Sequence, residues 1–170
     1  MKKILLVLLI VAALLGGYYV HDLIYYNDSV AFVSPVEGDV IKLRYDKFGD
    51  GHFGAKRSRG RIHKGIDIAV ERGEPVFAIK SGWAVSNFDL DGYGNYVVIY
   101  HKDGFQSRYG HLEGTNMRWI KKVRQGDVIG WIGCTGNARS EGMKSHIHFE
   151  IRKDDVAMDP GIYLEEPIVK

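Results

Sequence analysis

The stretch that decides the fold alternates strictly between polar and apolar residues: His146-Ile147-His148-Phe149-Glu150-Ile151. Successive side chains of a β-strand point to opposite faces of a sheet. A strand here therefore turns its three apolar residues into a core and leaves His146, His148 and Glu150 on the other face. The two imidazoles then converge in front of the sheet. A strand whose exposed face happens to be rich in histidine is the plainer interpretation, and it explains two histidines less well than one.

A second segment follows a similar pattern, Arg61-Ile62-His63-Lys64-Gly65-Ile66-Asp67-Ile68-Ala69. As one strand it places His63 and Asp67 on the same face, with the isoleucines packing into the core on the other. Gly65 lies between the two polar residues and would keep side-chain bulk out of the space that a metal ion occupies. Taken alone, a pair of this spacing is common and is weak evidence for a metal site.

A third histidine, His111, lies in the stretch Tyr109-Gly110-His111-Leu112, just after an expected strand and close to a turn. On its own it would be interpreted as a loop histidine. Together the three segments supply histidines and a carboxylate, which are typical zinc ligands, and a catalytic zinc site needs three of them with one position left for water. Two further histidines would remain for proton transfer and for stabilising an oxyanion.

The rest of the chain predicts a β-rich fold. Short apolar runs alternate with turn residues, and 21 glycines against four prolines favour a protein rich in turns. The expected strands are 76–79, 84–88, 96–101, 105–109, 128–132 and 146–152, with a short helical turn within 114–122. We expect an all-β domain, either a single antiparallel sheet or a sandwich-like arrangement, after an N-terminal apolar helix.

The first twenty residues form a separate segment. Lys2 and Lys3 precede an apolar run from Ile4 to Leu15, the pattern of an export signal. The expected organisation is a signal peptide or uncleaved anchor at 1–20, a linker at 21–33, the domain at 34–165 and a tail at 166–170. A small-residue cleavage site is poorly formed, so an anchor that leaves the domain facing outwards is favoured over cleavage and secretion.

Charge and cysteine content exclude other classes. Two of the 23 Lys and Arg residues are Lys2 and Lys3, which leaves 21 against 21 Asp and Glu. The exported part is therefore neutral, and a nucleic-acid partner is not expected. Cys134 is the only cysteine, which excludes an intramolecular disulfide and a cysteine-rich zinc site. We expect it to be a packing residue.

Ten short motifs occur in the order typical of one known family: 35–38, 48–50, 61–67, 73–78, 81–85, 92–97, 109–112, 126–130, 146–150 and 158–160. From about Ser34 to Leu164 the chain resembles the lysostaphin-like zinc metallopeptidases, also called LytM-type domains. The resemblance covers nearly the whole exported part.

The resemblance implies one zinc ion held by His63, Asp67 and His148, with His111 and His146 as the catalytic pair. Which of the two takes the water proton stays open. It also implies cleavage of peptide stems or crosslinks of bacterial peptidoglycan. With the N-terminal segment, we expect a monomer in the cell envelope. Some domains of this kind instead regulate other wall hydrolases. A purely structural metal site is disfavoured, because it would have no use for two additional histidines.

Two segments depart from the family pattern or add to it. The link from Asn137 to Ser145 is longer than usual and lacks the usual proline, and we expect it beside the cleft, where it affects specificity. Lys56, Arg57 and Arg59 precede the first expected ligand. We expect them to be solvated loop residues. The less favoured alternative is that they contact carboxylates of a stem peptide.

Overall fold

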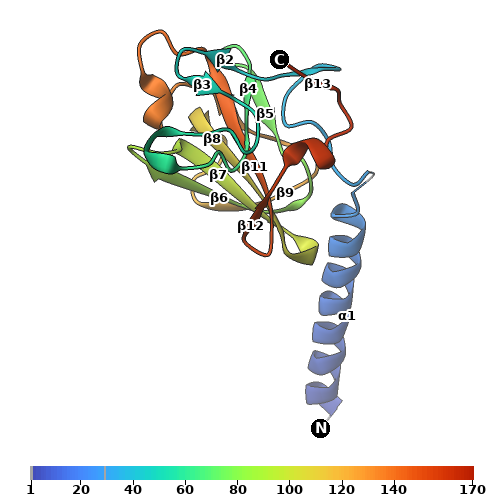
Figure 1. The fold of residues 1–170 in the computed structure, drawn as a ribbon. Coiled ribbons are helices and arrows are strands. Elements are labelled where there is room, and N and C mark those ends of the chain that lie inside the picture. The colour runs from blue at the N-terminus through green and yellow to red at the C-terminus, as the bar shows by residue number, and fades with distance from the viewer. Residues whose placement is uncertain (1, 29) are drawn as a thin grey trace.

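The computed structural model describes residues 2–28 and 30–170, in which a long helix projects from a β domain (Figure 1). Met1, at the start of the expected export segment, and Ser29, in the expected linker, lie outside the described residues, as do the side chains of Ile24, Tyr25 and Arg59. The expected β-rich fold is confirmed.

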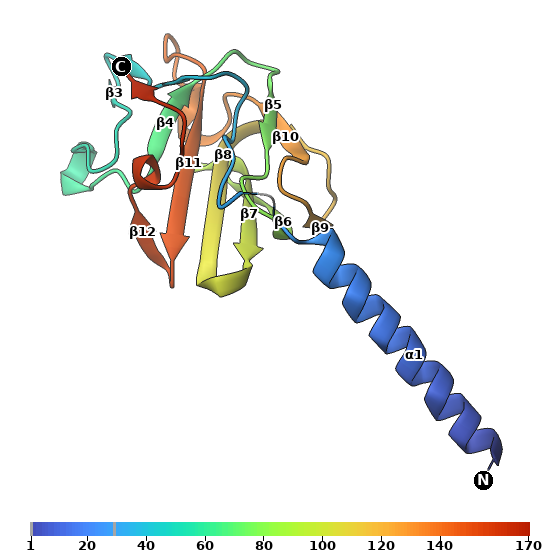
Figure 2. The same cartoon turned by 90° about the vertical axis from the view of Figure 1, so that its right-hand side faces the viewer.

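The domain is built on a nine-stranded sheet in which every pairing is antiparallel. Its main path has the order β12-β11-β8-β7-β6-β9, while β4 joins β11, and β10 joins β8 and β5 (Figure 2). The strands are β4 (Ile66–Ala69), β5 (Pro75–Phe77), β6 (Gly82–Asp89), β7 (Gly94–His101), β8 (Phe105–Thr115), β9 (Ile120–Val123), β10 (Val128–Ile132), β11 (His146–Lys153) and β12 (Val156–Met158).

Shorter elements complete the domain. A parallel pair joins β1 (Ile41–Lys42) to β13 (Ile168–Val169), and an antiparallel pair joins β2 (Tyr45–Asp46) to β3 (Gly49–Asp50). Four 3₁₀ turns lie at Ser58–Gly60, Lys102–Gly104, Gly136–Arg139 and Pro160–Ile162. Part of the expected tail at 166–170 is therefore paired with the start of the domain.

The core is formed by the apolar faces of these strands, as the alternation in 146–151 predicted. Ile147, Phe149 and Ile151 are fully buried, together with Tyr109 of the neighbouring strand β8. The rings of Tyr109 and Phe149 contact each other with their centroids 5.4 Å apart. Burying side chains of this size contributes roughly 1.5–3 kcal/mol each, so these residues anchor the pair β8–β11 in the core.

Two expectations about local structure were wrong. No helical turn forms within 114–122, because β8 continues to Thr115 and β9 begins at Ile120, where pairing with β6 satisfies its backbone. The segment 61–69 is a strand only from Ile66 to Ala69. Ile62 lies outside it in an isolated bridge with Lys56 and is 54% exposed.

Gly65 has a structural role that the sequence did not reveal. A side chain at this position would place its Cβ only 2.2 Å from the carbonyl oxygen of Phe149 in β11. The glycine is thus needed for the close approach of two backbones.

The N-terminal helix α1 (Lys2–Tyr25) is longer than expected, so residues 21–25 of the expected linker are helical. Residues 2–23 are long and apolar enough to cross a membrane by length and composition, as a signal sequence also can be. The helix contains no proline and is rich in leucine, which favours its continuity.

A buried polar chain joins strands β7 and β8 to the segment between β5 and β6. His101 Nδ1 donates to the carbonyl of Ser81 at 3.0 Å, so its Nε2 accepts from Ser107 Oγ at 2.8 Å. Ser107 Oγ also lies 2.8 Å from the hydroxyl of Tyr109, which accepts from the backbone N–H of Ile79. Burial lowers the pKa of His101 to about 4.

This shift predicts a loss of stability in acid. Because the pKa of His101 is lower in the folded chain than the usual value near 6.5, the unfolded chain binds the proton more tightly. The contribution of neutral His101 to the free energy of unfolding is fully present above about pH 6.5. It is lost as the pH falls towards about 4, by about 3 kcal/mol in total. The free energy of unfolding, measured in urea at neutral pH and near pH 4.5, should change less with pH for His101→Gln than for the unmodified chain. Equal pH dependence would contradict this account.

Candidate metal centre

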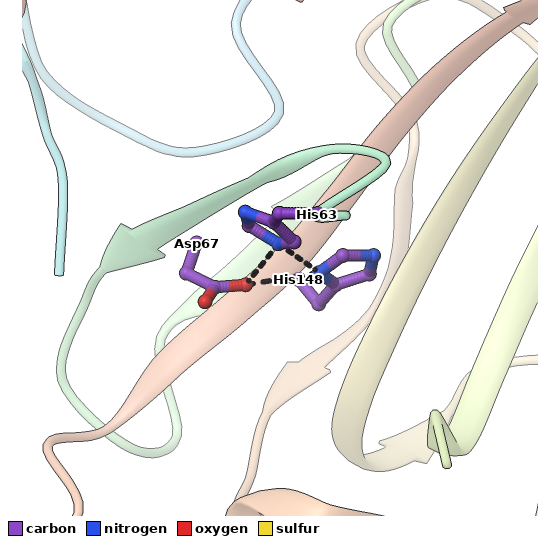
Figure 3. A group of neighbouring side chains, drawn as sticks. All are labelled: His63, Asp67 and His148. Atoms are coloured by element: carbon purple, nitrogen blue, oxygen red, sulfur yellow. Dashed lines mark hydrogen bonds and ion pairs between the residues drawn. The ribbon is translucent and has the colours of Figure 1, made fainter. Parts of the chain in front are cut away.

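Three side chains meet at one point on the face of the sheet opposite the core. Asp67 in β4 and His148 in β11 are directly opposite each other in the antiparallel register, and His63 reaches the same point from the loop before β4 (Figure 3). His148 Nδ1 lies 2.9 Å from Asp67 Oδ1 and 3.0 Å from His63 Nε2, and His63 Nε2 lies 3.1 Å from Asp67 Oδ1. Three ligand atoms thus form a nearly equilateral triangle.

Hydrogen bonds on the far side of each ring orient both imidazoles. His63 Nδ1 donates to the carbonyl of His52 at 2.8 Å, which leaves the lone pair of Nε2 facing the triangle. His148 Nε2 lies 3.1 Å from Glu150 Oε1, so a proton there leaves the lone pair of Nδ1 facing the same point. Such outer partners, carbonyl or carboxylate, are typical of metal-binding histidines.

The second oxygen of Asp67 is also occupied. Asp67 Oδ2 accepts from Arg44 at 2.9 Å and from Arg57 at 2.7 Å, which directs Oδ1 towards the two imidazoles. Arg44 is buried and also binds Asp46 at 2.6 Å. The carboxylate is therefore held so that it can offer one oxygen to a cation.

These atoms fit a zinc ion. Ligand atoms about 2.0–2.2 Å from one tetrahedral zinc lie about 3.3–3.6 Å apart, a few tenths of an ångström more than the separations seen here. Two imidazole nitrogens and one carboxylate oxygen are a donor set that zinc uses in catalytic sites, and binding of the metal would displace any proton held between these three atoms. A small outward shift of the three side chains would accommodate the ion.

The electrostatic environment favours a positive charge at this point. Burial alone would raise the pKa of Asp67, but hydrogen bonds and charge from His148 and His63 hold it well below its usual range. Burial alone would lower the pKa of His148, yet Asp67 and Glu150 raise it to about 9. The two carboxylates would stabilise a bound metal ion in the same way.

The remaining two histidines lie beside this triangle. The rings of His111 and His146 are 5.0 Å apart between centroids in an edge-to-face arrangement, and His111 is 6.0 Å from His148. His111 Nδ1 donates to the carbonyl of Thr135 at 3.1 Å, and His146 Nδ1 donates to that of Lys144 at 2.8 Å. Each ring therefore keeps a lone pair on Nε2.

Both of these histidines are kept neutral. Burial, reinforced by the neighbouring His146 and His148, lowers the pKa of His111 to about 3. Burial also lowers the pKa of His146. A neutral imidazole with a free lone pair can accept a proton, which is the property required of a general base.

His111 does not lie in a loop, as its neighbours in sequence suggested, but inside the long strand β8. Its φ of 66° is in the left-handed region, where pairing with β7 and β10 becomes irregular. Its backbone N–H donates to the carbonyl of Tyr93 at 2.6 Å. A non-glycine residue held in this conformation is uncommon, and such residues cluster at functional sites.

Two polar side chains that support the site were not singled out from sequence. Glu150 accepts from the hydroxyl of Tyr93 at 2.6 Å and from Arg152 at 2.9 Å while it faces His148. The alternation in 146–151 did place Glu150 on the histidine face, and that was the available signal. No comparable signal marked Arg44, which approaches Asp67 from a separate part of the chain.

The basic segment before the first histidine behaves differently from a solvated loop. Arg57 is bound to Asp67, so that expectation was wrong for this residue because a buried carboxylate lies within reach. Lys56 is exposed, and the side chain of Arg59 lies outside the described residues.

The segment 137–145 flanks the histidine pair. The backbone N–H of Lys144 donates to Asp46 at 3.1 Å, and Arg139 binds Asp91 at 3.2 Å. Because Thr135 and Lys144 supply the carbonyls that bind His111 and His146, the two ends of this segment orient both rings.

The chain is similar to several curated bacterial proteins. It is 39% identical to "Lipoprotein NlpD/LppB homolog" of Pseudomonas aeruginosa over 63% of this chain and 35% of that protein. It is 39% identical to "DD-carboxypeptidase/endopeptidase Mpg" of Neisseria meningitidis over 59% of this chain and 22% of that protein. It is 33% identical to "Murein hydrolase activator NlpD" of Escherichia coli over 78% of this chain and 31% of that protein. The match thus spans about a third or less of these relatives.

Solved structures share the fold. A zinc-containing peptidase of Vibrio cholerae aligns with a TM-score of 0.61 and 30% identity over 76% of this chain and 39% of that one. The catalytic domain of lysostaphin from Staphylococcus simulans aligns with a TM-score of 0.56 and 30% identity over 71% of this chain and 91% of that one. A chain of the SpoIIQ–SpoIIIAH pore-forming complex aligns with a TM-score of 0.62 and 30% identity over 80% of this chain and 92% of that one.

The family model of peptidase family M23 matches residues 61–160, more than half of the chain. This range includes all five residues of the histidine and aspartate cluster. The chain therefore belongs to peptidase family M23.

Proposed function

We propose that this chain is a zinc-dependent endopeptidase that hydrolyses peptide stems or crosslinks of bacterial peptidoglycan. One observation carries the proposal: a complete three-atom donor triangle lies beside two buried histidines that are neutral and keep a free lone pair. Structural metal sites need no such pair, whereas hydrolysis needs a group that accepts a proton and a group that stabilises the developing charge.

His63, Asp67 and His148 would hold the zinc ion through Nε2, Oδ1 and Nδ1. When bound, zinc lowers the pKa of a water molecule and polarises a carbonyl group. His111 and His146 lie on one side of the triangle, where the Nε2 of one would accept a proton from water. The other would take a proton from solvent as negative charge develops and donate it in a hydrogen bond to the oxyanion. Thr135 and Lys144 hold both rings in the tautomer that this requires.

The peptidoglycan substrate is supported by the relatives. Their names include an endopeptidase and an activator of murein hydrolases. The N-terminal helix supports a place in the cell envelope, with α1 crossing the membrane and the domain outside. We propose that the chain acts there as a monomer and needs no cofactor besides zinc.

A non-catalytic role is the second candidate, in which the domain regulates other wall hydrolases. It is favoured by the similarity to "Murein hydrolase activator NlpD". The complete set of donor and proton-accepting residues favours the enzyme, because a domain that only binds a partner does not need them.

Substitution of ligand and catalytic residues should separate metal binding from turnover. His63→Ala and Asp67→Ala should abolish zinc binding, because each removes one of three donors. His111→Ala should retain zinc and lose release of muropeptides from purified sacculi, by about 10²–10⁴-fold if this residue transfers the proton. Zinc content by atomic emission and muropeptides by mass spectrometry measure the two effects.

Each outcome discriminates between the proposals. Zinc binding without cleavage by the unmodified chain would favour the regulatory role. Loss of zinc from His111→Ala, to the same extent as from His63→Ala, would contradict the roles assigned to these histidines.

The outer partner of His148 should contribute to metal affinity. Glu150→Gln keeps the size of the side chain but removes the charge that faces His148 Nε2, and removal of such partners typically costs about 10–100-fold in affinity. Competition with a chromogenic chelator measures the change. Glu113→Gln, which removes an exposed carboxylate paired with Arg72, is the matched control and should leave affinity unchanged. Equal affinities for both variants would contradict this role of Glu150.

A further inference from the structure

The edge of the sheet beside α1 is unusually apolar and basic. Strand β9 ends the main strand path and is preceded by a turn, in the stretch Arg118-Trp119-Ile120-Lys121-Lys122. Trp119 is 76% exposed and Ile120 is 61% exposed. Soluble proteins usually protect an edge strand with charge and avoid large exposed apolar side chains there. The lysine is present, but so are two side chains that favour a less polar environment.

The neighbouring strands continue the same surface. Lys122 is opposite Trp83 in β6, and Trp83 is opposite Tyr100 in β7, so the three side chains form a row across the strands. Trp83 is 48% and Tyr100 is 50% exposed. We refer to Trp83, Tyr100 and residues 118–122 as the β9 edge. Tryptophan and tyrosine mixed with lysine and arginine is the composition enriched at the interface between a bilayer and water.

Lys122 fixes this edge against the end of the helix. Its Nζ donates to the hydroxyl of Tyr18 at 2.9 Å and forms an ion pair with Asp22. It also lies 5.0 Å from the ring centroid of Trp83 and 5.1 Å from that of Tyr18, which are cation–π distances. In both views α1 leaves the domain beside β9 (Figures 1 and 2).

The length of α1 determines where the contacts of Lys122 would lie relative to a bilayer that the helix crosses. At about 1.5 Å per residue, Asp22 lies about 28 Å from Lys3 along the helix axis, close to the roughly 30 Å thickness of a hydrocarbon core. With the lysines at one boundary of that core, Asp22 and its partner Lys122 lie at the other. Trp83 contacts Lys122 and therefore lies at the level of the lipid headgroups.

We propose that the β9 edge lies on the surface of the bilayer that α1 crosses, with Trp119 and Ile120 among the headgroups. This inference rests on the membrane insertion of α1 proposed above. The bilayer is favoured over a second copy of the chain because the helix already holds the edge at this depth. Besides Lys122, which is paired with Asp22, residues 118–124 include Arg118, Lys121 and Arg124 and no acidic residue, so the surface suits anionic headgroups.

This placement determines where the metal centre faces. Strand β11 begins with the histidines of the site, and in both views this end lies farther from α1 than its other end (Figures 1 and 2). A domain resting on its β9 edge would thus present the site away from the lipid and towards the wall.

Quenching by brominated lipids tests the proposal on the full chain in vesicles of phosphatidylethanolamine and phosphatidylglycerol. Two versions keep one native tryptophan each, either Trp119 or Trp83, with the other tryptophans replaced by phenylalanine. The control replaces all three and carries Tyr45→Trp, at an exposed position in β2 at the opposite end of the domain (Figure 1). Bromine near the headgroups should cause a strong loss of emission from Trp119 and Trp83 but little from the control.

The possible results distinguish failure of the proposed surface contact from failure of membrane insertion. Flotation with the vesicles but equal, weak quenching at all three positions would overturn the proposal and leave membrane insertion intact. Failure to float would overturn both. Protection of Trp119 from iodide that depends on protein density, without quenching by lipid, would assign the edge to a second copy and also overturn the proposal. Stronger quenching of Trp119 with phosphatidylglycerol than with phosphatidylcholine supports the role of charge, and equal quenching would contradict it.

Discussion

The antiparallel register between β4 and β11 is the constraint on which the rest of the site depends. It places His148 opposite Asp67 and Phe149 opposite Ile66, so one pairing orders both the metal-facing and the core-facing sides. A slip of one residue would reverse both faces at once, because side chains alternate along a strand. The contact of Gly65 with the carbonyl of Phe149 restricts that slip, since any Cβ would clash there. The geometry of the donor triangle follows from this backbone arrangement.

The site divides into two parts with opposite electrostatic character. Around the triangle, Asp67 and Glu150 favour a positive charge, while Arg44 and Arg57 hold the outer oxygen of Asp67. Beside it, burial keeps His111 and His146 neutral, with their Nδ1 atoms bound to backbone carbonyls. A cation site next to two proton acceptors is the arrangement expected for hydrolysis by an activated water. The fold therefore places residues that favour a bound cation beside two neutral histidines, the pair proposed to transfer protons.

Local pattern was enough to predict part of this structure. Alternation in 146–151 identified β11 and its buried face, and it placed His146 and His148 together on the other face, because a half-buried strand must repeat every two residues. The same reasoning failed before Ile66, since Ile62 pairs with Lys56 of the preceding loop and Gly65 lies against the distant strand β11. His111 was placed in a loop because a left-handed residue inside a strand leaves no mark in the sequence. Arg44 and its bond to Asp67 depend on tertiary packing alone, and no local signal could have revealed them.

The central claim is that one zinc ion binds between His63, Asp67 and His148. The most direct test is anomalous diffraction at the zinc edge from crystals of the zinc-loaded chain. The account predicts one strong peak about 2.0–2.2 Å from His63 Nε2, Asp67 Oδ1 and His148 Nδ1. A zinc peak bound instead by His111 and His146, or no peak in this cluster after loading, would contradict it.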